Sequence, residues 1–166
     1  MRAFLTVAFT LCASTAFSAA ADDMVREIRH ELLLVPHYTV FDWLAWRVDG
    51  GKVTLLGAVV DAGMKRDAEK AVRSIQGVRD VQNNIEVLPA SGTDDRIRHD
   101  ILLSINKEMS AYLSQEVRQI HIIVKSGNVS LEGEAQSQAD KDKAGALTSH
   151  VQGVHQVANN LVVVTQ

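Results

Sequence analysis

The chain contains the same sequence pattern twice. GKVTLLG at residues 51–57 recurs as GNVSLEG at 127–133, and GVRDVQNNI at 77–85 recurs as GVHQVANNL at 153–161. Both pairs are separated by 76 residues, so the intervening stretch has the same length in each copy. This spacing indicates a tandem duplication of one small domain. The shared residues are mainly glycine, valine, leucine and asparagine, which constrain the architecture more than the chemistry.

The first 21 residues have the composition of a secretory leader. Arg2 follows the initiating methionine, an apolar run extends over residues 3–13, and small residues lead to Ala21. This pattern predicts a signal peptide over residues 1–21, cleaved before Asp22. No later segment approaches the roughly 20 apolar residues that a spanning helix needs, so we expect the mature protein to be soluble or peripheral to the membrane. Cys12, the only cysteine, lies in the leader, and the mature chain needs no disulfide.

The charge balance bears on the class of partner. The net charge is −3, and removal of the leader with Arg2 makes it −4. Neither half has the positive excess expected of a nucleic-acid binder, so DNA and RNA are disfavoured. Each copy is so short that its own core is only marginally stabilising, and we expect the copies to pack on one another.

Apolar residues recur every three to four positions before Pro36 and again after Asp95. They predict a helix at the start of each copy, capped by Asp22 or Asp23 in the first and by Asp95 in the second. Alternating apolar residues on both sides of a glycine turn, at residues 44–55 and 120–131, predict a β-hairpin.

A second helix is predicted to begin at Asp61 in the first copy and at Ser137 in the second, and a last strand follows each. The fold class is therefore α+β: two tandem sandwiches, each helix-strand-strand-helix-strand, with a three-stranded sheet packed on two helices. The domains are predicted at residues 22–90 and 91–166. Six glycines are interpreted as fold-determining, in turns and at helix ends that need positive φ: Gly51, Gly57, Gly77, Gly127, Gly133 and Gly153.

The paired motifs GGKVTLLGAV with GVRDVQNNIEV, and SGNVSLEGEA with GVHQVANNLVV, resemble those of tandem BON-domain proteins, including osmotically inducible periplasmic proteins. The resemblance covers essentially the whole mature chain. It implies a periplasmic location and a domain associated with phospholipid or envelope-surface binding rather than with catalysis. The matched residues are mostly fold-determining, so no binding residue is carried over from the family.

Aromatic residues gather between the first predicted helix and the first strand. Tyr38, Phe41 and Trp43 lie there within six positions, and strand alternation directs Trp46 inward. Such a cluster suits a membrane interface or a protein partner. The alternative is that these side chains cap the sheet or fill the interface between the copies.

Three basic residues fall on one stripe of the second helix of the first copy. Arg66, Lys70 and Arg73 are spaced to meet lipid phosphates electrostatically, although Asp67 and Glu69 dilute the stripe. The alternative is a solvated helix face carrying charges of both signs.

No arrangement typical of catalysis is found. The six histidines have no convincing metal-ligand spacing, and no serine or cysteine lies in a nucleophile motif. We therefore expect no enzymatic activity, metal or cofactor.

The leading hypothesis is a periplasmic, envelope-associated module that binds phospholipid head groups weakly, anionic ones above all, and supports envelope integrity under osmotic stress. The alternative is an adaptor that docks an envelope protein through the aromatic segment.

Overall fold

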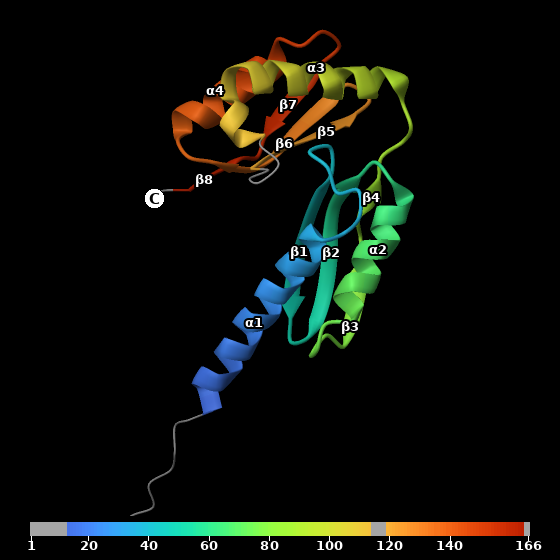
Figure 1. Cartoon of the computed structure of the whole chain (residues 1–166), viewed down its shortest axis with the longest axis vertical. Coiled ribbons are helices and arrows are strands. Elements are labelled where there is room, and N and C mark those ends of the chain that lie inside the picture. The colour runs from blue at the N-terminus through green and yellow to red at the C-terminus, as the bar shows by residue number, and fades with distance from the viewer. Residues whose placement is uncertain (1–12, 114–118, 165–166) are drawn as a thin grey trace, which may run out of the picture.

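The computed structural model describes residues 13–113 and 119–164, with side chains from residue 22 onward (Figure 1). The first unit comprises α1 (Ala13–Leu33), β1 (Trp43–Asp49), β2 (Lys52–Val59), α2 (Ala62–Arg73), β3 (Asp80–Asn83) and β4 (Glu86–Val87). The second comprises α3 (Gly92–Met109), the 3-10 helix η1 (Ser110–Tyr112), β5 (Ile120–Lys125), β6 (Asn128–Ala135), α4 (Gln138–Ser149), β7 (Gln156–Asn159) and β8 (Val162–Val163). The predicted α+β class in two tandem units is confirmed.

The two sheets have the same topology. In the first, β1 pairs antiparallel with β2, and β3 and β4 pair parallel with the other side of β2. In the second, β5, β6, β7 and β8 repeat this order. Trp46 lies opposite Leu55 and Ile122 opposite Leu131, so the hairpin register is identical in both copies.

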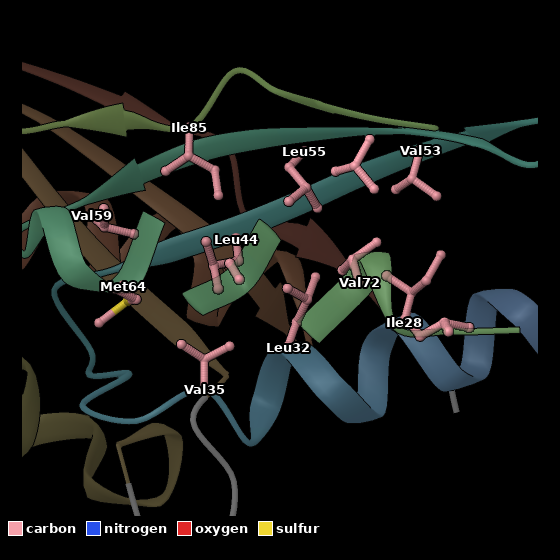
Figure 2. Packing of buried hydrophobic residues seen from close by; sticks show 13 residues of the cluster. Ile28, Leu32, Val35, Leu44, Val53, Leu55, Val59, Met64, Val72 and Ile85 are labelled. Atoms are coloured by element: carbon pink, nitrogen blue, oxygen red, sulfur yellow. The ribbon is translucent and has the colours of Figure 1, made fainter. Parts of the chain in front are cut away.

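Each sheet buries one face under its pair of helices. Figure 2 shows the first core, where Ile28 and Leu32 of α1 and Met64 and Val72 of α2 point toward the strands. Met24 packs against the edge of this core, two residues beyond the predicted cleavage point. Ile97, Ile101 and Ile105 of α3, Ile120 and Ile122 of β5, Leu131 and Ala144 are among the residues of the second core.

The first helix of each copy begins earlier than predicted. The capping roles assigned to Asp22 and Asp23 are wrong, because α1 already runs through them from Ala13. The preceding residues are rich in alanine, which has the highest helix propensity and lets the helix continue upstream. The capping role assigned to Asp95 is also wrong, since Ser91 accepts the hydrogen bond from the backbone amide of Asp94. Residues 1–12 of the predicted leader lie outside the described residues.

The repeated Asn-Asn pair marks a break in the last strand and joins it to a helix. Asn83 Nδ2 donates to the carbonyl of Lys65 on α2 at 2.8 Å, and Asn159 Nδ2 donates to the carbonyl of Lys141 on α4 at 2.7 Å. Asn83 Oδ1 also accepts the amide of Ile85 at 3.2 Å. One side chain therefore ends a strand segment and holds the crossover helix on the sheet, which explains its recurrence.

The glycines that close the two hairpin motifs have no room for a side chain. Gly57 and Gly133 both have φ of 112°, and a Cβ added there would lie 2.0 Å from the carbonyl oxygen of Trp43 or Gln119. At both positions a residue other than glycine would have an unfavourable positive φ and a steric clash with the neighbouring strand.

We expect Gly57→Ala to lower the free energy of unfolding by roughly 2–4 kcal/mol, because the added Cβ meets strained backbone and a carbonyl that cannot move freely. Urea denaturation measures the change. Gly92→Ala is the matched control, since nothing lies within 4 Å of its added Cβ, and it should stay within about 0.5 kcal/mol of wild type. Equal effects of the two substitutions would contradict the steric account.

Candidate functional site

The basic stripe predicted on α2 lies on the face opposite the core. Met64, Ala68 and Val72 form the buried side of the helix. Arg66, Lys70 and Arg73 are all exposed and fall on the outward side of the same turns. Asp61 caps the helix as predicted, its carboxylate accepting the amide of Gly63 at 2.7 Å. The helix register that buries the apolar stripe therefore presents these three cations to solvent.

The three cations and Glu69 line an open hollow of about 330 Å³. Arg73 Nη2 donates to Glu69 Oε1 at 2.7 Å, and Asn83 Nδ2 donates to Glu69 Oε2 at 3.1 Å. Arg66 Nη1 reaches the carbonyl of Ala62 at 3.3 Å. Arg73 is thus partly neutralised, while Arg66 and Lys70 are left without an ion pair among the described residues.

The neighbours of Glu69 extend the ionised range of its carboxyl to lower pH. The hydrogen bond from Arg73, followed by that from Asn83, lowers the pKa of the Glu69 carboxyl below its ordinary value of 4.5, and desolvation opposes this only in part. A carboxyl whose pKa is lower in the folded than in the unfolded state stabilises the fold at pH values above its unfolded-state pKa. This stabilisation is lost as the pH falls through its folded-state pKa. The hollow therefore keeps its negative group to a lower pH than an isolated glutamate would.

We predict that Arg73→Ala raises the pKa of Glu69, because the largest stabilising hydrogen bond to the carboxylate is removed. NMR titration of the Glu69 side-chain carboxyl measures the shift. Asn83→Ala should produce a smaller rise, and Arg26→Ala, a substitution on α1 where the arginine pairs with Asp23, should produce none. A Glu69 pKa that does not respond to loss of Arg73 would contradict this electrostatic assignment.

The aromatic segment lies between the two copies. The amide of Ile122 on β5 donates to the carbonyl of Val40 at 2.8 Å, and Val40 and Phe41 pack against the second core. The rings of Tyr38 and Trp43 lie 5.4 and 5.1 Å from the ring of His121. Figure 1 shows this loop extending from the end of α1 toward the second sheet. Tyr38, Phe41 and Trp43 are thus half-buried and in contact with residues of the second unit.

This contact buries the outer side of β5. The sequence pattern directs His121 away from the core, and it does lie on the outer face. The side chain is nevertheless only 4% exposed, because the rings of Tyr38 and Trp43 lie against it, and Ile123 on the same face is 9% exposed. Sequence reasoning did not identify Val40 or His121 as interface residues. The sequence feature that could have indicated this interface is Ile123, an apolar residue on a strand face expected to be polar.

Two further interactions shape this end of the first unit. Asp42 is fully buried and accepts hydrogen bonds from the amides of Thr39 and Val60, both at 2.9 Å. Lys125 of β5 forms an ion pair with Glu86 of β4 at 2.5 Å. Asp42 thus fixes the loop to its own domain, and the ion pair between Lys125 and Glu86 joins the two domains.

We expect Trp43→Ala to increase the hydrogen-exchange rate of the Ile122 amide about tenfold or more, because loss of the ring contact with His121 loosens the segment that accepts this hydrogen bond. Amide exchange measured by NMR reports it directly. Leu103→Ala is the control, since Leu103 is 55% exposed on α3. Unchanged protection of Ile122 in the Trp43 variant would show that the contact does not hold the domains together.

Within residues 13–113 and 119–164, no group of three or more histidine, cysteine, aspartate or glutamate side chains is arranged to hold a metal ion. None of the helices in these ranges is both long and apolar enough to cross a bilayer.

Comparison with known proteins identifies the family. The BON domain matches residues 46–89 and 93–165, one match in each unit. The chain belongs to the BON domain family. It is 24% identical over 144 residues to the osmotically-inducible protein Y of Escherichia coli (strain K12). The aligned region covers 84% of this chain and 72% of that protein.

Two solved structures also show similarity. CdsD, a structural protein of the type III secretion system of Chlamydia trachomatis, matches with 13% identity and a TM-score of 0.36, covering 87% of this chain and 93% of that one. The C-terminal domain of CdsD matches with 12% identity and a TM-score of 0.31, covering 86% and 98%.

The two BON domains present different surfaces on equivalent helices. The positions of Arg66, Lys70 and Arg73 are taken in α4 by Asp142, Ala146 and Ser149. Lys143 of α4 is paired with Glu108 at 3.4 Å. The basic face is therefore a property of the first BON domain, while the second supplies the surface that the aromatic segment covers.

Proposed function

We propose that this BON protein is a non-enzymatic, periplasmic, envelope-associated protein that binds phospholipid surfaces weakly and supports envelope integrity under osmotic stress. The family, the similarity to the osmotically-inducible protein Y and the predicted leader support this function. The family also supports the absence of catalysis. In this proposal the protein remains peripheral to the membrane.

The observation that carries the proposal is the outward face of α2. Arg66 and Lys70 are exposed and Arg73 adjoins them around one open hollow, so several phosphates of a lipid surface are accessible to them together. Each basic residue near an anionic surface contributes about 1 kcal/mol, and salt screens this attraction over a Debye length of about 8 Å. The overall negative charge opposes binding at longer range. Weak and salt-sensitive association is therefore expected.

The adaptor hypothesis is not favoured by the arrangement of the aromatic segment. Phe41 packs against the second core, and Trp43 lies against His121. These contacts leave both side chains only half-exposed, which reduces the apolar surface available to a protein partner.

We predict that the mature protein, residues 22–166, floats with vesicles made of phosphatidylethanolamine and phosphatidylglycerol at low salt, and that flotation decreases at physiological salt. Arg66→Glu combined with Lys70→Glu should reduce apparent affinity about tenfold or more, because two attractive charges become repulsive. Co-flotation at several lipid concentrations measures the loss.

The matched control reverses two lysines in the second domain, Lys141→Glu with Lys143→Glu, which changes the net charge by the same amount on α4. This variant should retain most of the binding. Equal losses in both double variants would assign the attraction to net charge rather than to the α2 face. Absence of flotation of the wild-type protein at both salt concentrations would remove the lipid function.

A further inference from the structure

The hollow on α2 combines charges of both signs within one small surface. Three cations, Arg66, Lys70 and Arg73, share it with the carboxylate of Glu69. The mature chain as a whole is negative, so a strongly anionic surface repels most of the protein. A ligand that carries a phosphate and a positive group together meets the local charges without this long-range repulsion.

Glu69 is held so that it can accept a further hydrogen bond. Arg73 occupies one position on Oε1 and Asn83 one position on Oε2. A carboxylate has about four acceptor positions, so each oxygen retains one. The carboxyl is ionised at neutral pH, and its lowered pKa extends this charge to lower pH. The carboxylate is therefore a fixed negative acceptor beside two cations.

The cationic side of the hollow has the capacity to bind phosphate. Among the described residues, Lys70 Nζ makes no hydrogen bond or ion pair, and Arg66 uses one of its five donors on the carbonyl of Ala62. Charge-assisted hydrogen bonds from such donors to phosphate oxygens are the strong kind. Phosphate recognition therefore falls to Arg66 and Lys70, because Arg73 is engaged with Glu69.

We propose that this hollow recognises the phosphoethanolamine head group, with the phosphate on Arg66 and Lys70 and the primary ammonium on Glu69. The inference rests on the proposed lipid function and specifies its ligand. A primary ammonium donates hydrogen bonds to a carboxylate, whereas the quaternary ammonium of choline has no N–H and is usually held by aromatic rings. The residues that line the hollow include no aromatic ring. Phosphatidylglycerol offers a phosphate and no cation.

The second BON domain lacks this constellation and provides an internal comparison. Gly145 stands at the position equivalent to Glu69. The second domain therefore has no carboxylate at this position, and a Cβ added to Gly145 would lie 2.8 Å from Asn159 Nδ2.

The test compares vesicles of phosphatidylcholine alone with vesicles in which part of it is replaced by phosphatidylethanolamine or by phosphatidylglycerol. We expect phosphatidylethanolamine to increase the apparent affinity of residues 22–166 roughly twofold to fivefold over phosphatidylcholine, the range of one exposed charge-assisted contact. Glu69→Gln should abolish this preference and should strengthen binding to phosphatidylglycerol, because the hollow loses its negative charge.

Asp67→Asn is the matched control. It removes the same charge from the same helix, but Asp67 does not line the hollow. This variant should keep the preference for phosphatidylethanolamine over phosphatidylcholine. Equal behaviour of the Glu69 and Asp67 variants, or equal binding to phosphatidylethanolamine and phosphatidylcholine, would overturn the inference while leaving the lipid function intact. Absence of binding to all vesicles would instead remove the proposed function itself.

A measurement with soluble head groups separates recognition from membrane effects. Titration with O-phosphoethanolamine should shift the NMR signals of amides in residues 66–73, and phosphocholine should shift them less. Circular dichroism and the melting temperature establish that Glu69→Gln is folded. Equal shifts from both compounds in the wild-type protein would overturn the assignment of the ammonium to Glu69.

Discussion

The parallel placement of the last strand beside β2 constrains the rest of each domain. Parallel neighbours need a long crossover, and here α2 or α4 supplies it. Once α2 crosses the sheet, its apolar stripe at Met64, Ala68 and Val72 must face the strands. Asn83 then links the end of β3 to the helix backbone. The outward direction of Arg66 and Lys70 follows from this geometry.

The limited size of each domain explains why the copies are in contact. A sheet of this size with two helices buries little surface, and β5 would leave an open edge and the apolar Ile123 exposed. The segment around Val40 contacts this edge, contributing one backbone hydrogen bond and apolar contacts with the second core. Asp42 holds this segment in its own domain. One short loop thus protects an edge strand and joins the two units.

Duplication preserved the scaffold and allowed the surfaces to diverge. Glycine at positions 57 and 133 and asparagine at 83 and 159 recur because backbone space and strand-to-helix hydrogen bonds require them. Outward residues on the crossover helices are under no such constraint. The result is a basic face on one domain and a covered, apolar strand on the other.

The sequence by itself determined the two-domain α+β architecture, the positions of the turn glycines and the basic stripe at Arg66, Lys70 and Arg73, because these depend on local conformation and on periodicity along a single element. The start of α1 was predicted too late, because the alanine-rich residues before Asp22 favour a helix and no capping residue ends it there. Only the tertiary structure decided the burial of His121 and the grouping of Glu69 with Asn83. Both arise from elements distant in sequence, and neither periodicity nor composition specifies which surfaces come together.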